Sequence, residues 1–159
     1  MLSARNCRKT LKPDDLRTMT DTPLLPPDDS WIPVEDEGFV HHVGPLWFRD
    51  VPDAPQWIGF RAATHHKNLN GVVQGGMLMT LADRGMGRIA RKAHGGPVAT
   101  VSFGYDFLGA ARLGRFVELH PRVVKETGGL VFMEGEVIAD GELIGRAHGV
   151  WKKLKQKPV

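Results

Sequence analysis

The hydrophobic pattern of the chain becomes helical directly after two glycines, Gly75 and Gly76. From there, apolar residues recur at intervals of three and four positions, as on one face of a helix: Met77, Leu78, Leu81, Ala82, Ile89 and Ala90. The spacing predicts a helix from about Gly75 or Gly76 to Lys92. Basic residues near Lys92 suit the C-terminal end of the helix dipole, and the sequence His-Gly-Gly-Pro at 94–97 is expected to end the helix.

Strand patterns lie on both sides of this helix. Two short runs, within 44–49 and 56–63, surround loop-forming residues and predict a hairpin. Longer runs rich in alternating, β-branched or aromatic residues follow at 98–107, 116–125, 130–139 and 143–153. The predicted fold class is therefore α+β, with one long central helix wrapped by a curved antiparallel sheet of about six strands.

Short signals between and within the later runs predict local features of the sheet. Gly128-Gly129 and Asp140-Gly141 are typical of hairpin turns. Pro121 cannot donate to a strand ladder, so we expect a bulge or an exposed edge at that position.

The chain is organised as one domain. Its 159 residues suffice to bury a core without disulfides. Residues 1–30 carry prolines and charges but no strand or helix pattern, and they predict a flexible N-terminal tail in which Met19 is an alternative translation start. Residues 31–159 then form the single predicted domain.

The composition narrows the classes of function. The formal net charge of +3 is mild, so we expect no nucleic-acid partner. No apolar run approaches the ~18 residues of a membrane span. The single cysteine, Cys7, excludes an internal disulfide framework and favours a reducing, cytoplasmic compartment. The histidine pairs at 41–42 and 65–66 lack ligand spacing, so no metal site is expected.

A carboxylate, Asp83, lies about two turns inside the predicted helix. Residues three, four and seven apart share a helix face, and its neighbours on that face are small, hydroxylic or apolar: Gly76, Met79, Thr80, Met86, Gly87 and Ala90. An acid in such surroundings is costly unless it is paired or used. Asp83 is therefore either a catalytic group or an acid that pairs with a basic residue across a subunit contact.

The residues around the two glycines form a spaced motif. An Asn, a glycine, a Gln-Gly-Gly run, a Leu and an Asp stand at Asn68, Gly71, Gln74, Gly75, Gly76, Leu81 and Asp83. This motif resembles that of hotdog-fold acyl-CoA thioesterases of the phenylacetate-pathway (PaaI-like) type. The turn at 108–114 also resembles the turn before the long strand in that family, and the resemblance spans about residues 40–155.

The resemblance implies a hotdog fold and the hydrolysis of an acyl-CoA thioester to free acid and CoA, without a cofactor. It assigns the role of general base or nucleophile to Asp83. It assigns polarisation of the thioester carbonyl to the backbone N–H of Gly75, at the positive end of the helix dipole. Asn68 and Thr100 fall at further catalytic positions.

Gln74 and Gly76 fall at substrate-binding positions of the motif. The usual family residue at position 74 is His, whereas Gln can hydrogen-bond but cannot carry a proton near neutral pH. We interpret this position as one that orients the glycine loop. Ser102 is expected on the same strand face as Thr100 and is a second candidate hydroxyl.

Gly75 and Asp83 are too far apart to act on one carbonyl within one chain. At the rise of an α-helix, eight residues separate them by roughly 12 Å. The resemblance implies that they act across two subunits, so we expect a homodimer, with a dimer of dimers left open. Two other functions also stay open. One is a non-catalytic acyl-binding hotdog module, which would not need Asp83, and the other is a hotdog hydratase or dehydratase, which would need a proton-carrying His.

Overall fold

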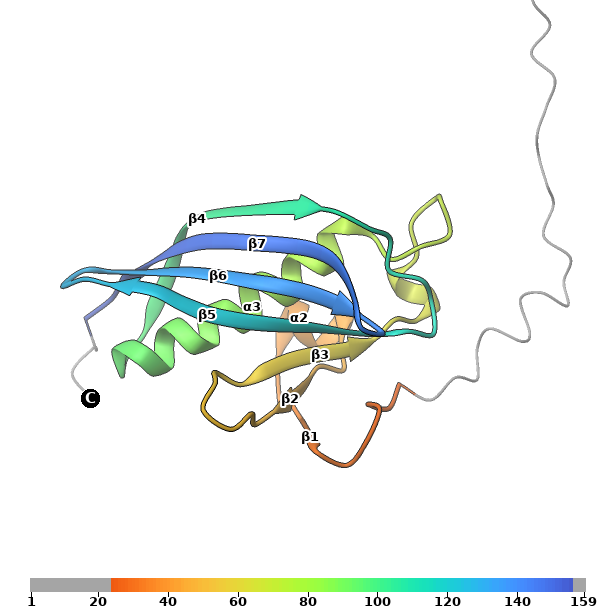
Figure 1. The fold of residues 1–159 in the computed structure, drawn as a ribbon, viewed down its shortest axis with the longest axis horizontal. Coiled ribbons are helices and arrows are strands. Elements are labelled where there is room, and N and C mark those ends of the chain that lie inside the picture. Colours follow the sequence, from red (N-terminus) through yellow and green to blue (C-terminus); the bar gives the residue numbers. More distant parts are fainter. Residues whose placement is uncertain (1–23, 156–159) are drawn as a thin grey trace, which may run out of the picture.

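The computed structural model describes residues 24–155 and shows one long helix against a curved antiparallel sheet (Figure 1). The helix is α3 (Gly75–His94), and the seven strands lie in the order β1-β2-β3-β5-β6-β7-β4. The strands are β1 (Trp31–Pro33), β2 (Trp47–Arg49), β3 (Trp57–Arg61), β4 (Val98–Phe107), β5 (Phe116–Glu126), β6 (Leu130–Ala139) and β7 (Glu142–Lys153). The α+β prediction is confirmed, with one strand more than expected.

Two short helical segments join these elements. They are α2 (Gly38–Val43) and the 3-10 turn η1 (Thr64–His66). No helix within residues 24–155 is both long enough and apolar enough to cross a membrane.

The long helix packs into the sheet through its predicted apolar stripe. Leu81 and Met86 are fully buried and belong to the same core as Leu119 of β5. Gly85 allows a close approach here, because a Cβ at this position would lie 2.4 Å from Ile58 Cγ2 and 2.5 Å from Leu119 Cδ2. The close packing of the helix against the sheet thus depends on a glycine at the contact as well as on the apolar residues around it.

Most predicted strands begin and end close to their expected positions. The runs 98–107 and 130–139 match β4 and β6, and the two short runs form the predicted hairpin of β2 and β3. The sequence did not predict β1, which has three residues, or α2, which buries none of its residues. Elements this short do not establish a hydrophobic period.

The predicted turns are also present. Both hairpins join antiparallel neighbours, and Asp140 and Gly141 have φ values of 49° and 82°, as a tight hairpin turn requires. Pro121 lies where β5 pairs with β6 alone, because its ladder with β3 ends at Leu119. One side of β5 is therefore unpaired at Pro121, but Pro121 itself is buried and the bulge of this strand lies further on, between Val123 and Lys125.

The first described residues run along the outside of the sheet. The indole N–H of Trp47 donates to the carbonyl of Leu24 over 3.2 Å, and Arg61 donates to the carbonyl of Leu25 over 3.0 Å. Residues 1–23, which include Cys7 and Met19 and most of the predicted tail, lie outside the described residues. The domain boundary near residue 30 stays a prediction.

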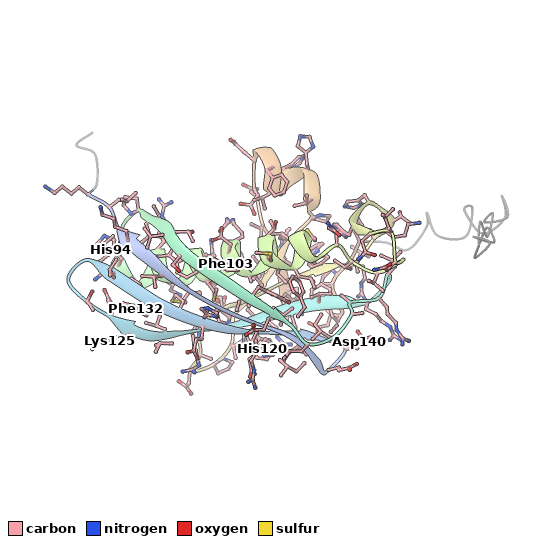
Figure 2. All side chains as sticks on the ribbon, turned by 90° about the horizontal axis from the view of Figure 1, so that it is seen from above. His94, Phe103, His120, Lys125, Phe132 and Asp140 are labelled. Atoms are coloured by element: carbon pink, nitrogen blue, oxygen red, sulfur yellow. The ribbon has the colours of Figure 1, made fainter. Side chains whose placement is uncertain are left out.

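The helix lies between the sheet and the short helix α2. Figure 2 shows α2 on the side of α3 away from β5, β6 and β7. At the edge of the sheet, β4 pairs with β7 and has no second strand partner within residues 24–155. Exposed apolar side chains lie along this edge and on the neighbouring helix surface: Val101, Phe107, Leu108 and Met79.

Candidate active site

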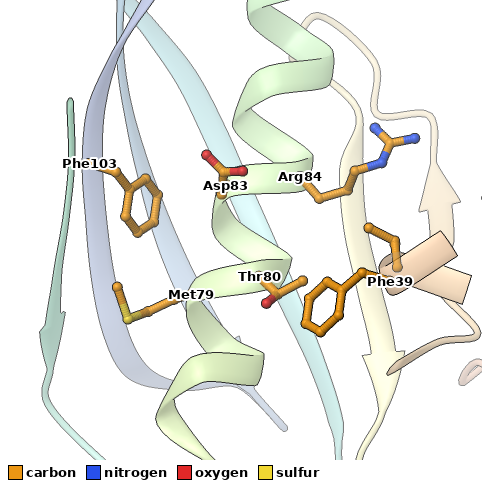
Figure 3. Close-up of a pocket in the computed structure, with 7 residues that line it drawn as sticks. Phe39, Met79, Thr80, Asp83, Arg84 and Phe103 are labelled. Atoms are coloured by element: carbon orange, nitrogen blue, oxygen red, sulfur yellow. The ribbon is translucent and has the colours of Figure 1, made fainter. Parts of the chain in front are cut away.

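Asp83 points from α3 toward strand β4, as Figure 3 shows. Its Oδ1 accepts a hydrogen bond of 2.9 Å from the hydroxyl of Thr100. The side chain is partly exposed in the single chain, so its negative charge is solvated as well as hydrogen-bonded. The structure thus brings together two of the predicted catalytic residues, Asp83 and Thr100.

The second candidate hydroxyl, Ser102, faces the other way. A β-bulge interrupts β4 between Thr100 and Ser102, so Thr100 pairs with the buried Trp151 whereas Ser102 pairs with Val150. Paired residues of neighbouring strands point to the same face, and the bulge adds one residue to the alternation. The expectation that both hydroxyls share a face was wrong, because strict alternation cannot anticipate a bulge.

The start of α3 presents backbone donors, as predicted for Gly75. The first N–H groups of a helix have no partner within it, and the N–H of Gly75 donates no backbone hydrogen bond within residues 24–155. The ring of Phe107 covers Gly75, since a Cβ built there would lie 2.9 Å from Phe107 Cε1. A Cβ on Gly76 would meet nothing within 4 Å, so packing alone does not require that glycine.

Asn68 shapes the loop before the helix. Its Oδ1 accepts the backbone N–H of Asn70 over 2.8 Å and that of Val72 over 3.3 Å, which makes it a turn-forming residue. Gln74 is exposed, does not cap the helix with its side chain, and donates its backbone N–H to the carbonyl of His66 over 2.7 Å. The Oδ1 of Asn68 is thus occupied by the turn, and its side-chain NH₂ is not used in these two bonds.

His66 is buried, and its structural role was not predicted from the sequence. Its Nδ1 accepts the backbone N–H of Ala63 over 2.9 Å, and its Nε2 lies 2.7 Å from the carbonyl of Val43. The ring is therefore neutral, with the proton on Nε2. Burial is the main cause that lowers the pKa of His66, and the neighbouring His65 lowers it further. His66 holds the end of α2 and the start of α3 in one network.

A groove of about 380 Å³ runs along the exposed side of α3. Figure 3 shows its floor on the helix, with Phe103 of β4 on one side and Phe39 of α2 on the other. The lining is mostly apolar, apart from three polar side chains: Thr80, Asp83 and Arg84. The sequence did not indicate Phe39 or Phe103, because α2 and the groove arise only from tertiary structure.

The structure separates two groups that the predicted mechanism joins. Gly75 and Asp83 lie on one unbroken helix, so the distance expected between them within a chain is retained.

Among residues 24–155, no group of three or more His, Cys, Asp or Glu side chains is arranged to hold a metal ion.

Comparison with known proteins places the chain in a family. The sequence model of the thioesterase superfamily matches residues 70–145. The Pseudomonas aeruginosa protein named "Putative esterase PA0474" is 32% identical over 111 residues, which cover 69% of this chain and 83% of that protein. The chain belongs to the thioesterase superfamily. It is accordingly a thioester hydrolase.

Solved structures confirm the hotdog fold of this family member. The TT0310 protein of Thermus thermophilus is 22% identical with a TM-score of 0.68, and the match covers 76% of this chain and 100% of that protein. A mutant of the phenylacetic acid degradation protein PaaI of the same organism is 22% identical with a TM-score of 0.67, covering 73% and 98%. The BH2602 protein of Bacillus halodurans, solved with CoA, is 18% identical with a TM-score of 0.64, covering 69% and 74%.

Proposed function

We propose that this thioesterase hydrolyses acyl-CoA, with Asp83 as the general base or the nucleophile. The observation that carries the proposal is the Thr100 to Asp83 hydrogen bond at the floor of an apolar groove. One carboxylate oxygen is fixed by Thr100, which leaves the other free to take a proton from water or to attack the thioester. The structural neighbour solved with CoA supports CoA as the thiol part of the substrate.

The oxyanion that forms during hydrolysis needs a hydrogen-bond donor. The N–H of Gly75 suits this role because it stands at the start of a helix with no partner among the described residues. As water adds to the carbonyl carbon, negative charge moves to the oxygen at this N–H. The C–S bond then breaks, and the departing CoA thiolate takes up a proton.

The active site is shared between two copies of the chain in this proposal. The helix keeps Gly75 apart from Asp83 within a chain, so a second α3 must bring its own Gly75 to the Asp83 of the first. The unpaired edge of β4 and its exposed Val101 and Phe107 suit such an association, because an open, apolar strand edge is a template for pairing. A further pairing into a dimer of dimers is part of the same proposal.

Asn68, Gln74 and Gly76 support this site in the proposal. Asn68 closes the loop that leads into α3 and offers its side-chain NH₂ to the substrate. Gln74 orients the start of the helix through its backbone bond to His66, and Gly76 leaves the entrance open.

The test is thiol release from a panel of acyl-CoA substrates. We expect the wild-type protein to release free CoA from at least one acyl class, with equal amounts of free acid. A protein that binds acyl-CoA without turnover would instead support the acyl-binding module, and hydration of an enoyl-CoA without thiol release would support the hydratase.

A further inference from the structure

The short helix α2 has no fully buried residue and contacts the core only through the partly buried Val40 and Val43. It covers six residues, and Phe39 on it is 66% exposed. A helix of this length does not stay folded through its own hydrogen bonds. Contacts beyond this limited apolar packing are therefore needed to hold α2 beside α3.

Two polar contacts anchor α2 at its two ends. Before the helix, Oδ1 of Asp36 accepts hydrogen bonds from Nε and Nη2 of Arg84, over 3.0 and 2.7 Å. This ion pair is mostly buried, with the side chains 27% and 14% exposed. At the end of the helix, the carbonyl of Val43 accepts the hydrogen bond from His66. Both anchors connect α2 to the region that carries the candidate active site, since Arg84 follows Asp83 directly in the chain.

The groove lies between this anchored helix and β4. We propose that Phe39 and Val40 of α2, defined here as the side wall, select the acyl group of the substrate, and that the Asp36 to Arg84 ion pair positions the wall. The proposal rests on the proposed acyl-CoA thioesterase function and names its substrate class: thioesters whose acyl group carries an extended apolar tail.

The dimensions and lining of the groove support this class of substrate. Its volume of about 380 Å³ is well above the ~150 Å³ of a cavity that holds one benzene molecule. The side wall and Phe103 present apolar surface on opposite sides, with Asp83 between them at the reacting end. Each methylene group that is buried against such a surface strengthens binding about fourfold. The side wall can therefore distinguish substrates by the length of the acyl tail.

The first experiment measures kcat and KM of Phe39→Ala on acetyl-, octanoyl- and dodecanoyl-CoA. We expect the ratio of kcat/KM for the best long-chain substrate to that for acetyl-CoA to fall about tenfold, mainly through KM. The matched control is Ile32→Ala on β1, an exposed apolar residue outside the groove, which should leave the ratio as in the wild type. An unchanged ratio in Phe39→Ala overturns the role of the wall.

The second experiment tests the anchor with Asp36→Ala. This variant leaves Arg84 partly exposed to water, and its kcat/KM ratio should fall in the same direction as that of Phe39→Ala. Backbone amides of residues 38–43 should exchange hydrogen faster, and Asp36→Glu should restore part of both effects. Faster exchange with an unchanged substrate ratio would show that the ion pair holds α2 but that α2 does not select the substrate.

Failure of the wall and failure of the proposed function give different results. If the wild-type protein releases no thiol from any acyl-CoA, the proposed function is wrong. In that case, calorimetry of octanoate and dodecanoate binding to wild type and Phe39→Ala still tests whether the side wall binds an apolar tail. Equal affinities of the two proteins for dodecanoate would overturn it.

Discussion

The hydroxyl of Thr100 on β4 donates a 2.9 Å hydrogen bond to Oδ1 of Asp83 on α3. This bond joins the edge strand of the sheet to the middle of the only long helix within residues 24–155. It fixes the orientation of a carboxylate that would otherwise rotate freely at a partly exposed position. It also occupies one carboxylate oxygen of a residue that lines the groove.

Substitution of Asp83 by Asn removes the basic group but retains the shape of the side chain. We expect Asp83→Asn to lower kcat about 10²- to 10⁴-fold, the usual cost of losing a general base. KM should change far less, because the groove and the Gly75 donor remain. Steady-state kinetics and thermal melting of the same preparation check this. A folded variant with near-wild-type turnover would remove Asp83 from the mechanism.

Thr100→Val replaces the hydroxyl with a methyl group of similar size. We expect kcat to fall about tenfold, which corresponds to ~1.4 kcal/mol of lost transition-state stabilisation, with KM nearly unchanged. Ser102→Ala is the matched control, because Ser102 lies beyond the bulge on the opposite face of β4. Equal losses in the two variants would contradict the assignment of Thr100.

Gln74→His introduces a group that titrates near neutral pH. The side chain of Gln74 is exposed and does not cap α3, so we expect the variant to keep most of its activity. The pH–rate profiles of the two proteins should coincide between about pH 6 and 9, because the position orients the loop and does not transfer a proton. A new ionisation in the profile of the variant would show that the residue at position 74 takes part in proton transfer.

The shared site predicts at least a homodimer in solution. Light scattering should give the mass of two or four chains under assay conditions, because a single chain cannot bring Gly75 and Asp83 to one carbonyl. Mixing Asp83→Asn with a Gly75→Pro variant, which lacks the donor N–H, should restore part of the activity. In a mixed dimer one site then holds both intact groups. A fully active monomer would contradict the shared site.

The sequence predicted the helix, the later strands and the turns because each has a local signal. The apolar stripe around Leu81 and the pair Asp140-Gly141 need no partner to be recognised. Ser102 was placed on the wrong face because a bulge depends on how two strands fit together. The groove could not be predicted, since α2 and its Phe39 are brought to α3 by contacts between residues far apart in the sequence, such as the ion pair of Asp36 with Arg84, 48 positions apart.

The buried ring of His66 predicts a loss of stability in mild acid. Burial and His65 lower the pKa of His66 in the folded protein below the usual value of about 6.5. Above that value the ring is neutral in both states and imposes no penalty. As the pH falls below about 6.5, the unfolded chain binds a proton that the folded chain does not, so the free energy of unfolding decreases until the folded pKa is reached.

Protonation in the folded state would also break the bond from Ala63 N–H to Nδ1, because both ring nitrogens then carry hydrogen. Urea unfolding between pH 7.5 and 5 should therefore show a decline of at most ~1.4 kcal/mol per pH unit from this group. The decline should be smaller in His66→Gln, whose amide can still accept from Ala63 and donate to Val43. His41→Gln, at an exposed histidine of α2, is the control and should follow the wild type. If His66→Gln shows the same slope as wild type, another group is responsible for the acid sensitivity.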